Sequence, residues 1–176
     1  PSLLHQLWLS GRKKPLYIVF PKGMEGLVNA LVDTFNLRAK KGIFDLVPVS
    51  IDFASGSSSF SAGSMSLRFF KTNHTAISVG IVIEEDGRKL VYTADTRPIE
   101  DPPAMLYGAD VLIHETNSEQ KLRKPDHCGG EDAGKLAAET GARRLILCHF
   151  PCGNEAKQRI LGEARLFFPE AELPVV

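Results

Sequence analysis

The sequence predicts a mixed α/β fold, rich in strands in its first half and alternating strands with helices in its second half. Alternating apolar residues on both sides of an Asp-Gly turn, within residues 77–92, are typical of a β-hairpin. Apolar residues spaced by three and four positions over 24–35 indicate a helix that lies on a sheet. After Asp95, apolar strand patterns alternate with helical ones, which favours βαβ connections.

In the first part of the chain, residues 3–8 form a short amphipathic helix and residues 16–20 (LYIVF) form a strand. The helical pattern that begins at Met24 follows this strand. Residues 44–53 are predicted to be extended, with an interruption at Pro48, because proline has no N–H to donate to a neighbouring strand.

The segment SGSSSFSAGS at residues 55–64 has two interpretations. It is either a flexible linker or a strand–turn–strand unit with Ala62-Gly63 as the turn. We prefer the second, because an apolar strand follows at once at 67–70.

The second half contains predicted strands at 109–113 and 144–148. A helix at 131–140 ends at Gly141, and a last helix follows Asn154, which we expect to cap it.

The 176 residues fit a single domain, 1–176. The chain has 43% apolar and 24% charged residues, a composition that is sufficient for a packed core. The 21 basic and 21 acidic residues cancel, so no overall field attracts a polyanion. We interpret the basic clusters at 12–14, 38–41 and 121–124 as solvated surface rather than as binding patches. No apolar run approaches the ~20 residues of a membrane span, so no membrane contact is expected.

The three cysteines, Cys128, Cys148 and Cys152, argue against a disulfide framework and favour a reducing, cytoplasmic setting. A structural zinc clip around His149 is one interpretation of the last two. However, three ligands on one short segment do not complete a tetrahedral site. We therefore interpret Cys148 as a small buried residue of a strand.

Four apolar strands run directly into ionisable side chains. The residues at these strand ends are His74, Asp95, the pair His114 and Glu115, and His149. Imidazole and carboxylate are normal ligands for zinc-type ions, and two such ions ~3.5–4 Å apart can activate water at an ester or phosphodiester. The alternative, a nucleophilic triad, needs an activated serine or cysteine, and the sequence has no G-x-S-x-G motif.

Four motifs occur in order: YTADTRP (92–98), VLIHETN (111–117), HCGGEDAGKLA (127–137) and RRLILCHF (143–150). Together they resemble the C-terminal half of the metallo-β-lactamase superfamily, most closely its ribonuclease Z-like branch. The resemblance extends back to RKKPLYIVFPKG (12–23) and so covers nearly the whole chain. It implies an α/β fold, the αβ/βα sandwich of that superfamily, incomplete in its N-terminal half, and a metal-dependent hydrolase.

The resemblance also implies roles for single residues. His74 resembles the third histidine of the first metal site, Asp95 the carboxylate that bridges both metals, and His149 the last histidine, on the second metal. Glu115 and His127 resemble the pair beside the metals, where the histidine stabilises charge on the phosphate or protonates the leaving group and the carboxylate orients it. Asp95, His127 and Glu115 are thus the expected catalytic residues. The expected cofactors are two divalent ions, zinc or else manganese or iron.

The sequence departs from the pattern of this branch in several places. The signature H-x-H-x-D-H, which supplies four ligands in the family, does not occur in these 176 residues, so we expect a chain truncated at its N-terminus that binds metal weakly or not at all and is inactive alone. His74 and Asp95 are only 21 residues apart, which excludes a long RNA-gripping arm between them. Ala94 replaces a usual glycine, and Thr116-Asn117 replaces Ala-Thr.

Three hypotheses remain open. The first is a hydrolase that directs water at a phosphodiester, in a small molecule or in nucleic acid, and forms a homodimer as family members often do. The second is a non-catalytic interaction domain. The third keeps the fold and metals but acts on a sulfate ester, lactone or thioester, because fold alone does not decide the substrate.

Overall fold

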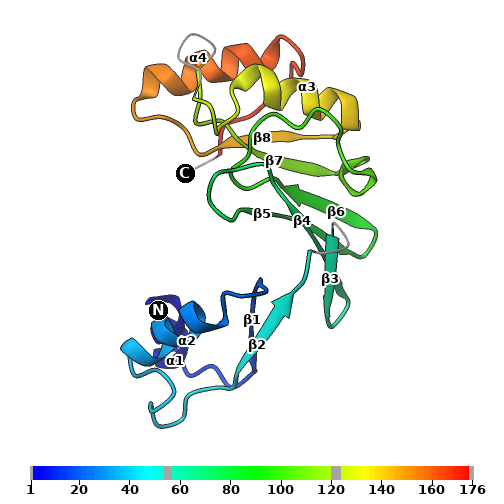
Figure 1. Ribbon diagram of the computed structural model, residues 1–176. Helices are drawn as coiled ribbons and strands as arrows, with labels where there is room; N and C mark the ends of the chain where they lie inside the picture. Colours follow the sequence, from blue (N-terminus) through cyan, green and yellow to red (C-terminus); the bar gives the residue numbers. More distant parts are fainter. Residues whose placement is uncertain (1, 54–56, 120–123, 175–176) are drawn as a thin grey trace. The chain divides into compact units, whose positions relative to one another are not determined.

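The computed structural model describes residues 2–53, 57–119 and 124–174 (Figure 1). The chain divides into two compact units that meet in sequence near residue 55. The start of the segment 55–64 and most of the basic cluster 121–124 lie outside the described residues. In the described part, no helix combines the length and the apolar character that a membrane crossing requires.

The first unit contains a two-stranded parallel sheet and two helices. The elements are α1 (Ser2–Leu9), β1 (Leu16–Pro21), α2 (Glu25–Thr34) and β2 (Leu46–Ile51). The interruption expected at Pro48 is wrong, because Pro48 lies within β2 opposite Ile18. Among the described residues β2 pairs with β1 alone, so it is an edge strand, where proline is tolerated.

The second unit is built on a six-stranded sheet. Its strands, in spatial and chain order, are β3 (Ser57–Ala62), β4 (Met65–Lys71), β5 (Val79–Glu85), β6 (Arg88–Tyr92), β7 (Val111–Glu115) and β8 (Leu145–Cys148). β3 to β6 pair antiparallel, whereas β6, β7 and β8 pair in parallel. The strand–turn–strand interpretation of residues 55–64 and the hairpin at 77–92 are both confirmed.

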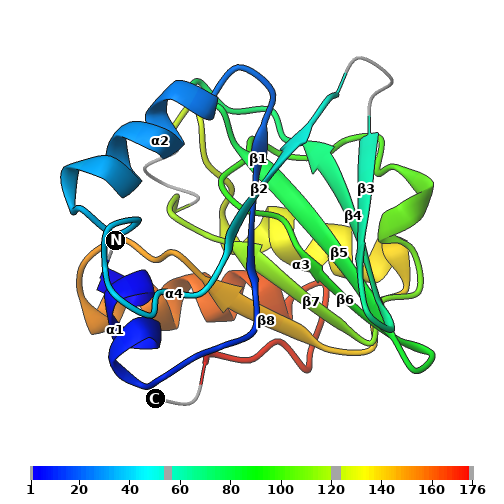
Figure 2. The ribbon, with the colours of Figure 1, turned by 90° about the horizontal axis from the view of Figure 1, so that it is seen from below.

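Two helices, α3 (Gly130–Thr140) and α4 (Asn154–Arg165), cover one face of this sheet (Figures 1 and 2). A short 3₁₀ helix, η1 (Ala104–Leu106), lies in the connection between β6 and β7. The core lies between sheet and helices, and it includes the fully buried Val82, Val91, Leu112, Leu145, Leu147 and Ile160. The helices approach each other closely at Gly130 and Gly134, where a Cβ would meet backbone of α4.

The predicted ends of these helices are only partly right. Gly141 ends α3 in the left-handed conformation, φ 63°, which glycine adopts without steric cost. The expected cap at Asn154 is wrong, because Gly153 is the N-cap and Asn154 is already the first helical residue. Gly153 has φ 106°, so the chain enters α4 through a backbone conformation that asparagine rarely adopts.

Candidate metal centre

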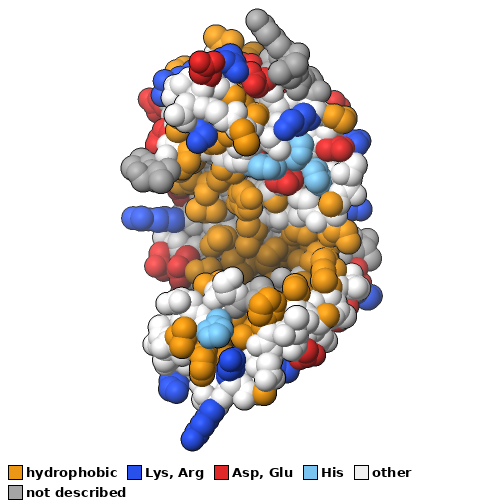
Figure 3. Space-filling view, turned by 90° about the vertical axis from the view of Figure 1, so that its left-hand side faces the viewer, with side chains coloured by type: hydrophobic (Ala, Val, Ile, Leu, Met, Phe, Trp, Pro, Cys, Tyr) orange, Lys and Arg blue, Asp and Glu red, His pale blue; other side chains and the backbone are white. Residues whose placement is uncertain are grey.

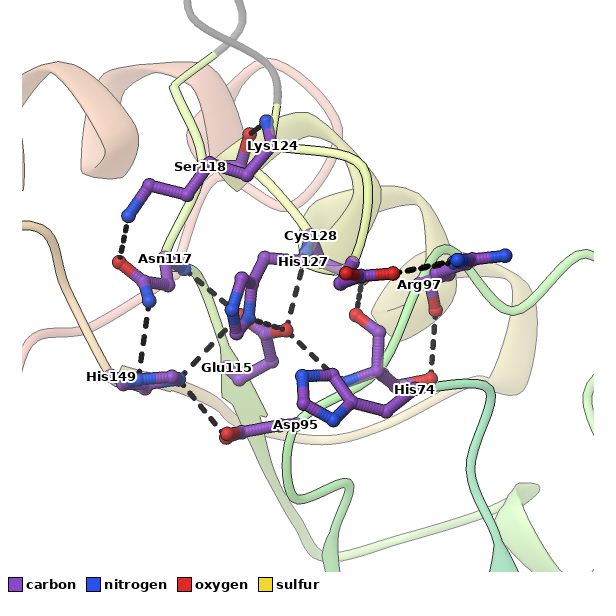
Figure 4. A network of polar contacts seen from close by, with 12 residues as sticks. His74, Asp95, Arg97, Glu115, Asn117, Ser118, Lys124, His127, Cys128 and His149 are labelled. Carbon is purple, nitrogen blue, oxygen red and sulfur yellow. Dashed lines mark hydrogen bonds and ion pairs between the residues drawn. The ribbon is translucent and has the colours of Figure 1, made fainter. Parts of the chain in front are cut away.

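Histidine and carboxylate side chains from five segments of the second unit meet at one edge of its sheet (Figures 3 and 4). β6, β7 and β8 are parallel, so their carboxyl ends lie at the same edge. Asp95 follows β6, Glu115 is the last residue of β7, and His149 follows β8 directly. His74 lies in the turn after β4, and His127 lies just before α3.

These five side chains form two groups whose ligand atoms lie within 4.8 Å of one another: His74, Asp95 and His127, and Glu115, His127 and His149. The ring of His127 lies between the other two histidines, with ring centroids 5.2 Å from His74 and 5.2 Å from His149. The structure therefore brings together every residue that the sequence proposes for the site. Which of them bind metal and which are catalytic remain predictions.

Glu115 is the buried centre of the hydrogen-bond network, with a side chain that is 0% exposed. Its Oε1 accepts from the backbone N–H of Thr96 at 3.1 Å and of Cys128 at 3.3 Å. The same oxygen lies 3.0 Å from Nδ1 of His127, and Oε2 accepts from the backbone N–H of Asn117 at 2.9 Å. An ionised carboxylate only accepts, so Nδ1 of His127 donates and Nε2 faces away from Glu115.

Asp95 is held by its backbone and faces His149 with its side chain. The hydroxyls of Thr72 and Ser78 both donate to its carbonyl oxygen at 2.7 Å, and its Oδ1 lies 3.0 Å from Nδ1 of His149. The preceding Ala94 has φ 53°, in the left-handed region that favours glycine, which explains why glycine is usual there. The two hydroxyls were missed by sequence reasoning, although both lie within four residues of His74.

The turn after Asp95 is tied to the segment that carries His127. Arg97 forms an ion pair with Asp126 at 2.6 Å, and this hydrogen-bonded guanidinium holds the pKa of the Asp126 carboxyl below its usual range. His114, at the end of β7, is buried, and its Nδ1 lies 2.6 Å from the carbonyl oxygen of Glu115. Burial lowers the pKa of His114, so it is a neutral, packed residue, as expected for a side chain on the face opposite to Glu115.

Two ionisable side chains near the site, Cys148 and Tyr92, have pKa values that are raised mainly by burial. Burial, with the nearby carboxylates Glu115 and Asp95, raises the pKa of the Cys148 thiol to about 11. Burial, and after it the charges of Cys148, Asp95 and Glu115, raise the pKa of Tyr92. A protonated thiol is a poor metal ligand, and neither candidate ligand group among the described residues contains a cysteine. These observations favour the interpretation of Cys148 as a packed strand residue.

A cavity of about 790 Å³ lies beside this site. Asn73, next to His74, and Thr96 and Arg97, next to Asp95, form part of its wall. The rest of the wall is mixed, with the apolar Phe70, Ile99 and Met105 and the charged Lys71, Glu100 and Asp101. Its volume falls in the range of small-molecule sites, so part of a substrate can fit next to the histidines.

The model of the beta-lactamase superfamily domain matches residues 4–150. The chain belongs to this superfamily. A ribonuclease Z of Halorubrum lacusprofundi is 28% identical over 229 residues, covering 94% of this chain and 72% of that protein. A ribonuclease Z of Ignicoccus hospitalis is 24% identical and covers 97% of this chain and 72% of its own length. The expected ribonuclease Z-like branch, a group of metal-dependent hydrolases, is confirmed.

Solved structures agree on the fold of the superfamily. The metallo-beta-lactamase fold protein YhfI from Bacillus subtilis matches 98% of this chain and 67% of its own, with TM-score 0.74 and 23% identity. The short form of human tRNase Z matches 85% of this chain and 66% of its own, with TM-score 0.70 and 24% identity. The predicted α/β fold of the superfamily is therefore confirmed.

Proposed function

We propose that this protein is a phosphodiester hydrolase whose centre holds two divalent metal ions, with zinc as the first candidate and manganese or iron as alternatives. The convergence of His74, Asp95, Glu115, His127 and His149 carries the proposal. Relatives named ribonuclease Z support the choice of a phosphodiester as the bond that is attacked.

The donor set of this chain fits such ions. It offers three imidazoles and two carboxylates, the ligand types that zinc prefers. Asp95 and Glu115 bring two carboxylates to the site, and a divalent cation would neutralise their charge. We propose His74, Asp95 and His149 as the ligands, with Asp95 shared between the two ions. When bound, the ions would supply an activated water and charge stabilisation at the phosphate.

The remaining side chains act on the substrate and on its protons. Glu115 holds Nδ1 of His127, so the free Nε2 of that ring can stabilise charge on the phosphate or, when protonated, pass a proton to the leaving oxygen. The ion pair of Arg97 with Asp126 links the turn of Asp95 to the segment of His127 and so fixes the position of these two side chains relative to each other. The adjoining cavity can accept the part of the substrate that does not react.

Each three-residue group is smaller than the four or more ligands that a tightly bound ion needs. In the superfamily pattern the further ligands come from H-x-H-x-D-H, a motif that these 176 residues do not contain. We therefore propose that the 176 residues alone bind metal weakly and hydrolyse little, and that full activity requires this motif.

The test is hydrolysis of bis(p-nitrophenyl) phosphate with millimolar zinc or manganese. It compares the 176-residue chain with the same chain preceded by the H-x-H-x-D-H segment of a related ribonuclease Z. We expect hydrolysis from the extended protein that falls by at least a hundredfold on Asp95→Ala or His149→Ala. Full activity in both variants, or cleavage of a sulfate ester, lactone or thioester but of no phosphodiester, contradicts the proposal. A folded, metal-loaded extended protein without any activity favours the non-catalytic alternative.

We also propose that the two units belong to one domain and that the protein is a cytoplasmic homodimer. The superfamily match runs across both units, and the three free cysteines support a reducing compartment.

The apolar face of α2 supports the homodimer. On α2 and just beyond it, the side chains of Leu27, Leu31 and Phe35 are 54%, 45% and 52% exposed at four-residue spacing, which supports a contact with a second copy. Light scattering tests the dimer; a monomer at 100 μM contradicts it.

A further inference from the structure

Two of the three basic clusters of the sequence lie side by side in the first unit. Nε1 of Trp8 donates to the carbonyl oxygen of Lys41 at 3.1 Å, which attaches the second cluster to α1. A Cβ on Gly42 would lie 4.0 Å from Nζ of Lys13, so the first cluster reaches the loop that carries the second. The fold thus joins the two clusters into one surface. We call it the lysine patch, and it consists of Lys13, Lys14, Lys40 and Lys41.

The two arginines of these clusters stabilise the loops instead of adding to the patch. Nε and Nη2 of Arg12 donate to two backbone carbonyls of its own loop, both at 2.8 Å, and its guanidinium lies 5.5 Å from the ring centroid of the buried Phe44. Arg38 forms an ion pair with Asp33 at 3.2 Å. Both loops are therefore held in place by groups other than the four lysines.

The lysine patch carries positive charge that no carboxylate balances. Lys13, Lys14 and Lys41 are exposed, and Lys40 is half-buried, with Nζ 5.2 Å from the ring centroid of Trp8. Within the described part of the chain, none of the four lysines forms an ion pair. Basic residues outnumber acidic ones by seven to four over positions 1–55, so the neutral total of the chain conceals a basic first unit.

We infer that the lysine patch binds the phosphate backbone of a nucleic-acid strand. A single basic cluster is usually solvated surface, but two clusters brought together by the fold give several ammonium groups on one surface. Lysine binds phosphate as a point charge, and a strand of phosphates gains affinity from each counterion that the ammonium groups release. The inference goes beyond the proposed hydrolase, because all five residues of the metal centre belong to the second unit.

An anionic membrane surface is the alternative partner. Lipid-binding segments place large apolar side chains on one face beside their lysines. The two segments of the patch, SGRKKP (10–15) and AKKG (39–42), contain none. The exposed Leu3 and Leu9 of α1 are six positions apart, about 120° around the helix axis, and so do not share one face. The ring of Trp8 is held by its hydrogen bond to Lys41. These observations favour nucleic acid.

Trp8 is the single tryptophan of the chain, so its fluorescence reports on the patch. The protein is treated with EDTA and titrated with a 12-nucleotide oligouridylate in 50 mM salt. Anisotropy of a labelled strand measures the affinity in parallel. We expect binding with a change in Trp8 fluorescence. The logarithm of the binding constant should fall with the logarithm of the salt concentration with a slope of about −2, as three lysine–phosphate contacts on a single strand imply.

Three triple variants separate the patch from net charge. Lys13→Gln/Lys14→Gln/Lys41→Gln removes the exposed ammonium groups and should weaken binding by at least about tenfold, with a salt slope near zero. Replacing the same three lysines by arginine keeps the charges and should keep the affinity within about twofold. The control, Arg88→Gln/Arg143→Gln/Lys157→Gln, changes the net charge equally in the second unit and should bind like the parent. Circular dichroism checks that each variant is folded.

Equal affinities of the glutamine variant of the patch and of its control overturn the inference. Binding to phosphatidylcholine vesicles that contain 30% phosphatidylserine, without any binding to the oligouridylate, assigns the patch to a membrane and overturns it as well. The titration needs neither a metal ion nor hydrolysis. A failure of the proposed hydrolase therefore leaves this result intact, and a failure here leaves the hydrolase assay unaffected.

Discussion

The packing of α3 on α4 supports the segment that carries His127, and Gly130 is the residue that permits it. α3 begins three residues after His127. A Cβ at Gly130 would lie 2.0 Å from the carbonyl oxygen of Ile160 and 2.9 Å from Cβ of Glu163. The carbonyl oxygen belongs to the backbone of α4, so no side-chain rotation relieves the contact. Gly130→Ala therefore forces the two helices apart.

The size of the effect follows from these distances. The carbonyl oxygen must move by about 1.4 Å to pass from 2.0 Å to an ordinary contact at 3.4 Å. Overpacking of this kind costs up to about 3 kcal/mol, and the better helix propensity of alanine returns about 1 kcal/mol. We expect Gly130→Ala to lower the free energy of unfolding by about 2 kcal/mol. Gly162→Ala, in α4, is the control, since its Cβ meets nothing within 4 Å, and it should stabilise by about 0.5–1 kcal/mol.

Urea unfolding of the three proteins, followed by far-UV circular dichroism, measures both changes. The histidine NMR spectrum of Gly130→Ala should also show a displaced His127 resonance, because α3 carries the segment of that residue. If Gly130→Ala is as stable as Gly162→Ala, the close approach of α3 and α4 is not present in solution and the reasoning fails.

Three further predictions concern single residues of the second unit. Ala94→Gly should raise the free energy of unfolding by about 0.5–1 kcal/mol, because it removes left-handed strain at φ 53° but adds glycine entropy; a destabilised protein in urea unfolding contradicts this. His114 has a pKa lowered by burial, so the unfolded state takes up a proton first as the pH falls below the ordinary value of 6.5. Stability should therefore drop by up to about 1.4 kcal/mol per pH unit, and His114→Gln should flatten this slope in urea midpoints measured from pH 7.5 to 5.5. Cys148, with its pKa raised to about 11, should react with iodoacetamide at pH 8 on the order of a hundredfold more slowly than the exposed Cys152; equal rates by peptide mass spectrometry refute this.

The sequence predicts the elements of the fold well where a local pattern determines them. The hairpin of β5 and β6 follows from alternation around Asp86-Gly87, and the end of α3 follows from Gly141. Two local expectations fail for reasons of tertiary structure. Pro48 remains inside a strand because β2, in the part of the chain that the structure describes, is an edge strand. Asn154 does not cap α4 because Gly153 takes that position.

At the site, too, the sequence motifs predict the residues themselves but not the contacts that support them. Motifs at strand ends predict His74, Asp95, Glu115 and His149, and the motif before α3 predicts His127. The parallel pairing of β6, β7 and β8 brings together the strand ends that carry Asp95, Glu115 and His149. The supporting contacts are not visible in the sequence. They depend on backbone geometry and on side chains distant in the chain, as in the hydrogen bonds of Thr72 and Ser78 to the carbonyl of Asp95.

The central claim is that these five side chains form a centre for divalent cations. The most direct test is a crystal of this chain soaked in millimolar zinc, with anomalous diffraction recorded on both sides of the zinc edge; at this concentration even a weakly binding site fills. The account predicts anomalous peaks within ligand distance of His74, Asp95 and His149. Peaks only elsewhere, for example at Cys152, or none in a crystal where these side chains are ordered and open to solvent, contradict it.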